Sequence, residues 1–298
     1  MRFDVWGVSG TLATQHERDA EFASSRLWYW LDRVDEACNR FRPDSEISRI
    51  NAQPATTFEV SETMARCLQA ALRSASVTNG LCDPTTLVAL RALGYDRDFD
   101  ELASATIDVT SSSPTPGIEA ISFDEDTRLL ALERGCELDR GARAKALVAD
   151  LVVSELRERG GIVVEIGGDV ALHGRGPSGP WVVGVSDSLH LTGKEPRVSL
   201  TSGAIATSSC TARTWRAGGR IMHHIIDPRT GVCAEGPYAT ATVSAEDCVT
   251  ANAFATASLL WGEDASYHVA QAGWSARLVR HDGSVEFVGG WPQETLSA

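Results

Sequence analysis

The sequence lacks the features that mark membrane-spanning, secreted and metal-cluster proteins. It contains no run of about 20 apolar residues, so we expect no transmembrane segment. Its first residues have no apolar stretch of the kind found in a signal peptide. Its seven cysteines are odd in number and never spaced as C-x-x-C, so neither a disulfide framework nor a zinc site is expected. Scattered cysteines of this kind favour reduced thiols and a cytoplasmic location.

Basic residues are scarce: 27 Lys and Arg stand against 40 Asp and Glu, which gives a net charge of −13. Nucleic acids and anionic membranes bind basic surfaces, so we expect neither as a partner. A phosphate ligand in a local pocket remains compatible with this charge. The chain also lacks internal repeats and long linkers, and we predict a single domain over residues 1–298.

The hydrophobic pattern predicts more strands than helices. Apolar residues recur at helical spacing over residues 18–38, after Ser61, after Gly141, and from Asp247 to near Gly262. Strands are expected, among others, over residues 136–139, 162–166, 170–173, 219–226 and 239–245. Most neighbouring strands are close enough along the chain to be joined as hairpins. The sequence therefore predicts an α+β fold, an antiparallel sheet with helices packed on it.

One stretch, from His223 to Gly231, combines two imidazoles, a carboxylate, an arginine and a glycine. Pro228 biases Asp227 towards an extended backbone, and the residues after it are typical of a turn. Strand ends that present polar groups are common ligand sites. By itself, the pattern fits a hairpin corner with two solvated histidines at least as well.

Two further patterns have both a binding and a purely structural interpretation. Gly141 opens a helix with Lys145 one turn inside it, which would suit an anion or simply a capped helix with a solvated lysine. Asn252 and Thr256 share one helix face, where their oxygens could hold a hard cation or bond a neighbouring strand.

The chain has no Ser/His/Asp or Cys/His catalytic set and no spaced phosphate-binding glycine loop. Its motifs, taken in order from about Gly10 to Gly262, resemble the ApbE family, the FAD:protein FMN transferases. The matching segments are Gly10-Thr11, Asp44–Ser48 with Asn51, Asp83–Thr85, Asp139–Lys145, Ile166–Asp169, Ala206–Ser208, His224–Gly231 and Ala253–Thr256.

The resemblance implies a T-fold-like α+β core that binds FAD together with Mg²⁺. It implies an enzyme that splits the FAD pyrophosphate, passes FMN to a Thr or Ser hydroxyl of an acceptor protein, and releases AMP. The nucleophile would then belong to the acceptor, which accounts for its absence from this chain. Two alternatives stay open: an FAD-binding protein without transfer activity, and an FAD pyrophosphatase that gives FMN and AMP.

The resemblance also implies roles for individual residues. His224 would take the proton of the acceptor hydroxyl. The Mg²⁺ ligands would be the backbone carbonyl of Ala142 and the side chains of Asn252 and Thr256. The FAD contacts would be Ser9, Phe41, Leu81, Cys82, Asp83, Asp139, Lys145, Thr207, Ser208 and Ile225.

Several positions depart from the family pattern. Asn252 stands where aspartate is usual; it keeps an oxygen ligand but removes a negative charge, so we predict weaker Mg²⁺ binding. Ser9 and Phe41 stand where methionine and tyrosine are usual. Arg140 and Arg143 also differ from the family, and we hypothesise that one of them supplies positive charge that the metal no longer does.

Overall fold

The computed structural model describes residues 1–53, 55–97, 99–102, 113–139, 141–187 and 194–295. The chain divides into two compact units, each assembled from separated segments. The first unit contains Met1–Leu31, Lys145–Ser209 and Gly236–Ala298, and the second contains Asp32–Ala144 and Cys210–Glu235. The prediction of one domain over residues 1–298 stays a prediction.

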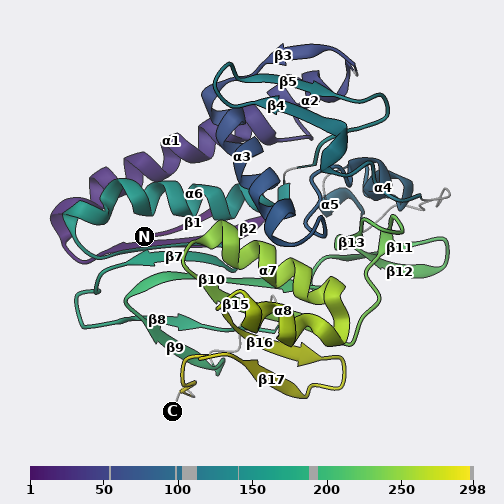
Figure 1. Cartoon of the computed structure of the whole chain (residues 1–298). Helices are drawn as coiled ribbons and strands as arrows, with labels where there is room; N and C mark the ends of the chain where they lie inside the picture. Colours follow the sequence, from purple (N-terminus) through teal and green to yellow (C-terminus); the bar gives the residue numbers. More distant parts are fainter. Residues whose placement is uncertain (54, 98, 103–112, 140, 188–193, 296–298) are drawn as a thin grey trace. The chain divides into compact units, whose positions relative to one another are not determined.

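The first unit is built on an eight-stranded sheet in which every neighbouring pair is antiparallel (Figure 1). The strands are, in spatial order, β1 (Arg2–Val5), β2 (Val8–Thr14), β6 (Ile162–Ile166), β7 (Asp169–His173), β10 (Ser202–Ser209), β15 (Tyr238–Ala245), β16 (Ser275–Arg280) and β17 (Val285–Val288). The expected antiparallel α+β architecture is confirmed.

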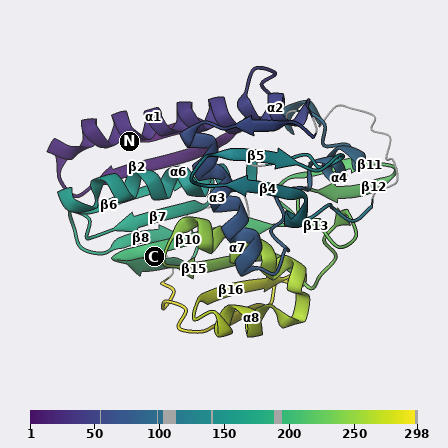
Figure 2. The same ribbon diagram turned by 45° about the horizontal axis from the view of Figure 1, so that its top comes forward.

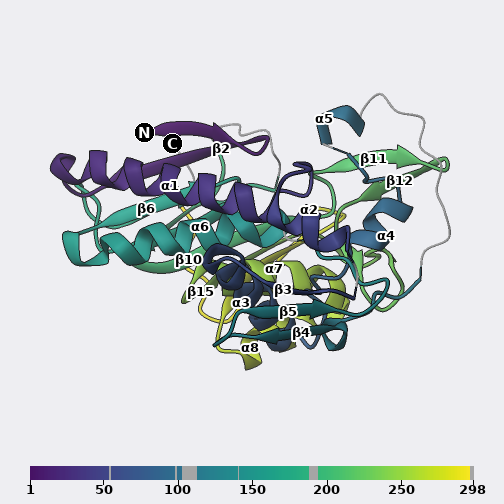
Figure 3. The ribbon, with the colours of Figure 1, turned by 90° about the horizontal axis from the view of Figure 1, so that it is seen from above.

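Helices pack on this sheet because each has a continuous apolar surface. Helix α7 (Cys248–Trp261) packs on β7, β10 and β15, and α8 (Ala265–Gln271) packs on β16 and β17. Helices α1 (Ala20–Cys38) and α6 (Gly141–Leu156) run side by side, as Figures 2 and 3 show, and Trp30 of α1 donates to Glu155 of α6 at 2.9 Å. Four 3₁₀ segments accompany the described helices: Glu17–Asp19, Ile118–Ala120, Arg157–Arg159 and Gly262–Asp264.

A two-residue turn of Gly167 and Gly168 joins β6 to β7, with φ angles of +58° and +92°. Positive φ at both positions is typical of the tight hairpin turn, and glycine adopts it without strain. A Cβ atom at Gly167 would also lie only 2.8 Å from the Val8 side chain. The strand predicted over residues 162–166 is confirmed, and it ends at these glycines.

The central strand β10 is covered on both faces. Its residues alternate, so Ile205 points away from the side of Ala204 and Ala206. Ile205 packs with Val185 and Val198 in a small apolar cluster, next to the two-stranded ribbon β8 (Trp181–Gly184) and β9 (Arg197–Leu200). Burial on both faces is seen in the middle of the strand, where Ala204, Ile205 and Ala206 are consecutive buried residues.

The second unit is made of short elements around a separate core. Its helices are α2 (Glu46–Asn51), α3 (Glu62–Val77), α4 (Leu87–Ala92) and α5 (Phe99–Leu102). Ser45 and Ser61 cap α2 and α3 by accepting from backbone N–H groups one turn in, as is usual for serine at this position. The strands form one three-stranded sheet and two ribbons: β3 (Thr57–Glu59), β5 (Leu129–Leu132) and β4 (Ile121–Asp124); β11 (Thr214–Ala217) and β12 (Arg220–His223); β13 (Ile226–Asp227) and β14 (Val232–Cys233).

The strand expected over residues 136–139 does not form. Cys136 and Leu138 are buried and alternate with half-buried neighbours, which produced the strand-like pattern. Their backbone bonds go elsewhere: the Asn51 side chain bonds both the N–H and the carbonyl of Leu138, and the Asp139 N–H donates to the carbonyl of Pro84 at 2.8 Å.

The strand expected over residues 219–226 is broken at His224. Strand β12 ends at His223, whose backbone N–H lies 3.3 Å from the sulfur of Cys233. The chain then passes through His224 and Ile225 before β13 begins. The carbonyl of Ile225 accepts from the N–H of Ala234 at 2.9 Å, so this residue is held outside a regular ladder.

No helix in the described part of the chain combines the length and the hydropathy needed to cross a lipid bilayer. All seven cysteines lie within the described residues and none forms a disulfide; six of them are buried.

Candidate functional site

A group of polar side chains lies on the side of the first unit's sheet that α7 covers; we call it the first-unit cluster. The Asn252 side chain donates from Nδ2 to Oδ1 of Asp169 at 3.0 Å, and the other Asp169 oxygen lies 3.5 Å from Nζ of Lys145. The hydroxyls of Ser208 and Thr256 are 2.9 Å apart. Asp169 therefore joins β7 to α6 and α7, and the Ser208–Thr256 contact joins β10 to α7.

Strand register explains why Asp169 and Ser208 lie on one face. Asp169 is directly opposite Ala206 in the β7–β10 ladder, and opposite residues of a ladder point to the same side. Ser208, two positions beyond Ala206, points to that side as well. Asn252 and Thr256 reach them from one face of α7, as their spacing predicts.

Burial makes the first-unit cluster electrostatically demanding. Asp169 is 1% exposed and Asn252 is 5% exposed. A buried carboxylate is tolerated when a cation and hydrogen-bond donors compensate for lost hydration, and Lys145 and Asn252 do so here. No donor in the described residues reaches the Asn252 side-chain oxygen.

The donor set of this cluster fits a hard cation. Mg²⁺ prefers oxygen ligands, and Asn252 and Thr256 offer an amide oxygen and a hydroxyl on adjacent turns of one helix. In the described ranges, no group of three or more His, Cys, Asp or Glu side chains is arranged to hold a metal.

Thr207 does not join this cluster, although it is adjacent to Ser208 in sequence. Alternation along β10 turns Thr207 to the opposite face, where its hydroxyl is 2.9 Å from that of Thr242. Its backbone N–H donates to Gly168 at 3.2 Å, and the carbonyl of Ser9 accepts from Gly167 at 3.0 Å. Ser9 and Thr207 therefore lie beside the glycine turn, and their predicted contacts with FAD stay predictions.

Sequence reasoning gave no role to Glu165, which also lies beside this turn. Its carboxylate accepts from the backbone N–H of Gly168 at 3.0 Å. Burial raises the pKa of Glu165, and the bonds from Gly168 and Thr11 offset only part of that effect. The signal that could have identified it is a lone carboxylate in an otherwise apolar strand.

In the second unit, Asp83 is the centre of a buried hydrogen-bonded corner. Its carboxylate accepts from the backbone N–H of Thr85 at 2.8 Å, from the Thr85 hydroxyl at 2.7 Å, and from the Thr115 hydroxyl. The N–H of Thr115 donates to the carbonyl of Pro228 at 2.9 Å. These bonds join the Asp83 corner to the turn that follows Asp227. Leu81 and Cys82 are buried beside it.

Asp139 is linked to the same corner and to an aromatic group. Its backbone bond to Pro84 fixes its position, and its carboxylate lies 3.7 Å from Nε of Arg40. The Arg40 guanidinium also lies 4.2 Å from the ring centre of Phe41 and 4.6 Å from that of Tyr95. We call Arg40, Phe41, Tyr95 and Asp139 the second-unit cluster.

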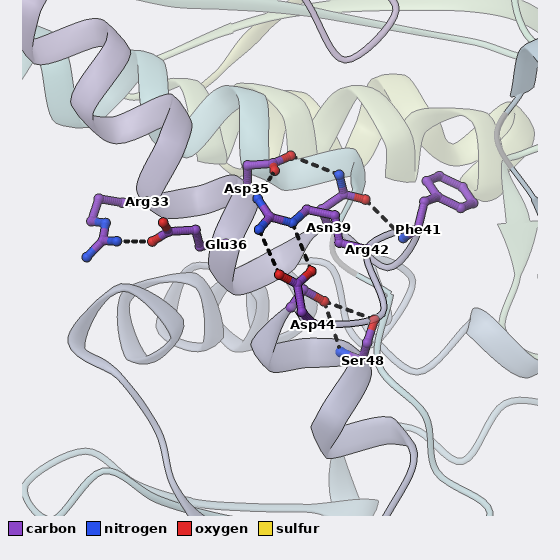
Figure 4. Close-up of polar contacts among 9 residues, drawn as sticks. Arg33, Asp35, Glu36, Asn39, Phe41, Arg42, Asp44 and Ser48 are labelled. Atoms are coloured by element: carbon purple, nitrogen blue, oxygen red, sulfur yellow. Dashed lines mark hydrogen bonds and ion pairs between the residues drawn. The ribbon is translucent and has the colours of Figure 1, made fainter.

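The loop that carries Phe41 is fixed by polar contacts, drawn in Figure 4. The N–H of Phe41 donates to the Asn39 side chain at 2.9 Å, and Arg42 bonds Asp35 at 2.8 Å and Asp44 at 3.1 Å. The Phe41 ring points away from these groups in Figure 4 and is 39% exposed. An exposed ring on a fixed backbone is suited to stacking on a ligand.

His224 and Ile225 lie between β12 and β13, His224 half-buried and Ile225 buried. The neighbouring His223 places Nε2 3.1 Å from the carbonyl of Ala234, a structural contact. Burial alone raises the pKa of Asp227, but its bonds to Arg229 at 2.7 and 2.8 Å more than offset this, so that its pKa lies below the ordinary value. The turn after Asp227 is therefore held by the bonds between Asp227 and Arg229.

Helix α6 begins in the second unit, with Ala142 in its first turn. Arg143 follows, is 8% exposed, and its Nε has no hydrogen-bond partner in the described residues. Arg140, the other arginine of our charge hypothesis, lies outside the described residues. The first unit thus brings Lys145 and Asn252 to Asp169 and Ser208 to Thr256. The second links Phe41, Asp83, Asp139 and the turn after Asp227.

Comparison with known proteins identifies the family. The model of the ApbE family matches residues 7–278. An FAD:protein FMN transferase of Vibrio cholerae is 28% identical over 85% of this chain and 78% of its own length, and one of Chlamydia trachomatis is 30% identical over 76% and 72%. The crystal structure of the ApbE protein from Thermotoga maritima superposes with a TM-score of 0.82 at 26% identity, covering 97% of this chain and 96% of that one. The chain therefore belongs to the ApbE family.

Proposed function

We propose that this chain is an Mg²⁺-dependent FAD:protein FMN transferase, which moves FMN from FAD to a Thr or Ser hydroxyl of an acceptor protein and releases AMP. The names of its relatives support the reaction class. The observation that carries the proposal is the first-unit cluster, in which Lys145 and the Asn252 NH₂ group both contact Asp169 and no described donor reaches the buried Asn252 oxygen. A lysine to bind phosphate and an oxygen ligand for a hard metal, held in one cluster, are what a diphosphate requires.

In the proposed reaction, the acceptor hydroxyl oxygen forms a bond to the phosphorus of the FMN half of FAD. The bond from that phosphorus to the oxygen bridging to AMP breaks, and AMP leaves with the bridging oxygen. The hydroxyl proton passes to the imidazole of His224, because histidine is the side chain best suited to general-base catalysis at neutral pH. No residue of this chain needs to form a covalent intermediate.

Asn252 and Thr256 would hold the Mg²⁺, with the carbonyl of Ala142 as the further ligand predicted from the sequence. When bound, this cation neutralises charge that develops on the phosphate oxygens. Lys145 would bind the diphosphate as a point charge. Phe41 would stack on a ring of FAD, and Asp139, held by Arg40, would accept a hydrogen bond from the ligand. The cytoplasmic location predicted from the cysteines is part of the same proposal.

The test is to incubate the purified chain with FAD, Mg²⁺ and a candidate acceptor domain, and to follow both covalent flavin and AMP. A protein encoded beside this chain is the natural first acceptor. In-gel fluorescence of denatured acceptor together with stoichiometric AMP is the expected result. AMP with free FMN in the absence of acceptor would instead identify a pyrophosphatase. Tight FAD binding without AMP would identify a flavin-binding protein.

A further inference from the structure

The contact between Asn252 and Asp169 determines which end of the Asn252 amide faces which way. A carboxylate can only accept hydrogen bonds, so the amide must turn its NH₂ group, not its oxygen, towards Asp169. The observed contact, 3.0 Å from Nδ2 to Oδ1, has this arrangement. The Asn252 oxygen is therefore turned away from Asp169.

The Asn252 side-chain oxygen has no hydrogen-bond donor among the described residues. Asn252 is 5% exposed, and within the described ranges no donor lies in hydrogen-bond distance of its Oδ1. A buried acceptor left unsatisfied destabilises the folded state. The orientation of this oxygen is therefore better explained by a ligand than by folding stability. Amide oxygens are ligands for hard cations.

Charge gives the amide at position 252 a consequence in this chain. Asp169 already places a carboxylate at this point, and Lys145, 3.5 Å away, balances its charge. An aspartate at 252 would place a second carboxylate directly against the first. Two facing carboxylates repel in a buried site unless a proton or a metal lies between them. The amide avoids this repulsion and keeps an oxygen ligand.

We propose that Asp169 is the positioning residue of the cation site: it fixes the Asn252 amide so that a neutral oxygen faces the metal, and it supplies nearby the negative charge that position 252 lacks. This inference rests on the proposed function, since it takes Asn252 as a metal ligand. The contact of Ser208 with Thr256 orients the second ligand in a similar way. Positions 169 and 252 form one coupled pair whose residue types can be exchanged.

The pair is tested with Mn²⁺, an oxygen-preferring ion that electron paramagnetic resonance can count directly. Binding is measured on the whole chain with FAD present, for the wild type, Asp169→Asn, Asn252→Asp and the exchanged double variant. Asp169→Asn is expected to weaken Mn²⁺ binding roughly tenfold or more, as is usual when a group that orients a ligand is lost. The exchanged variant should recover most of this loss, because an amide at position 169 again faces a carboxylate at position 252.

Thermal denaturation gives a second reading that does not depend on activity. Asn252→Asp should melt below the wild type without metal and gain more from Mg²⁺ than the wild type does, since the ion relieves the facing carboxylates. If Asp169→Asn folds and binds Mn²⁺ within twofold of the wild type, the proposal is wrong. If Asp169→Asn does not fold, the exchanged variant decides: restored folding and binding support the coupling, and folding without improved binding overturns it.

The outcomes separate this inference from the proposed function. If the wild type transfers FMN and Asp169→Asn binds Mn²⁺ normally, the proposed function is supported and the positioning role of Asp169 is wrong. If Mn²⁺ binding depends on both positions as predicted but the wild type never modifies an acceptor, the coupled pair is supported and the transferase function is wrong.

Discussion

The Arg40 guanidinium holds the Asp139 carboxylate while lying over the Phe41 ring, so one side chain fixes two residues that are predicted to contact FAD. Arg40 and Asp139 are both mostly buried, with side chains 8% and 16% exposed, and 3.7 Å separates Nε from Oδ1. The ring centre of Phe41 is 4.2 Å from the same guanidinium. Because the planar guanidinium serves both contacts at once, lysine is a poor substitute for it.

Replacing Arg40 by methionine should weaken FAD binding roughly tenfold, about 1.4 kcal/mol, because Asp139 loses its cation and Phe41 loses its support. Arg40→Lys should recover part of this loss through its charge alone. Flavin fluorescence titration measures both. Arg33→Met is the matched control, because the ion pair of Arg33 with Glu36 is exposed and in the same unit; equal losses in the two methionine variants would contradict the prediction.

Arg143 is expected to cost stability in the absence of an anionic ligand. Its guanidinium is buried and Nε lacks a partner in the described part of the chain. Replacing buried charge by an apolar side chain of similar size is often neutral or stabilising by about 1–4 kcal/mol. Arg143→Met should therefore leave urea denaturation unchanged or shift it upward. The stabilisation that FAD gives should fall in the same variant if Arg143 meets an anionic part of the ligand.

A clear loss of stability in Arg143→Met without ligand would show that the arginine has a structural partner. If FAD stabilises Arg143→Met as much as the wild type, Arg143 does not supply the positive charge that we hypothesise, and Arg140 remains as the candidate.

His224→Ala should lower the rate of FMN transfer by roughly 10²–10⁴-fold, the range expected for a lost general base. FAD affinity should stay within threefold, because the imidazole acts on the acceptor hydroxyl. His223→Ala is the matched control. It removes the contact with the Ala234 carbonyl, and should cost about 1 kcal/mol of stability with little effect on the rate. A reversed pattern in the two variants would reassign the base to His223.

The raised pKa of Glu165 should make the free energy of unfolding depend on pH. Burial raises its folded pKa above its ordinary value of 4.5. As pH rises through 4.5, the unfolded chain releases this proton before the folded chain does, so the wild type loses stability until the folded pKa is passed. Glu165→Gln, which cannot ionise, should match the wild type near pH 4 and exceed it near pH 7. Denaturant midpoints at these two pH values are sufficient, and the opposite order at pH 7 would show that the bond from Gly168 outweighs burial.

Local pattern was enough to predict most of the elements. The helices over residues 20–38, 62–77 and 248–261 follow from apolar spacing and, for the last two, from the capping residues Ser61 and Asp247. The glycine pair after Ile166 predicted the end of β6. These features depend on residues that are close together along the chain, so they can be predicted from the sequence.

The two strand errors have a different origin. Residues 136–139 alternate as a strand would, yet Asn51 and Pro84 take the backbone bonds of Leu138 and Asp139. After His223, which still pairs with Thr214, the chain leaves the expected strand, and the Ile225 carbonyl accepts from Ala234. In both segments the backbone bonds to residues outside a regular ladder, and hydrophobic spacing contains no information on those partners.

The sequence by itself determined the family resemblance, the antiparallel α+β class, the candidate residues and the missing carboxylate at position 252. Only the tertiary structure showed that Asp169 faces Asn252, that Arg40 joins Phe41 to Asp139, and that Thr207 turns away from Ser208. Motif residue types can be read in order along the chain, because each motif is local. The orientation of an amide or a carboxylate is decided by whichever group the folded chain places against it, and that group comes from another element.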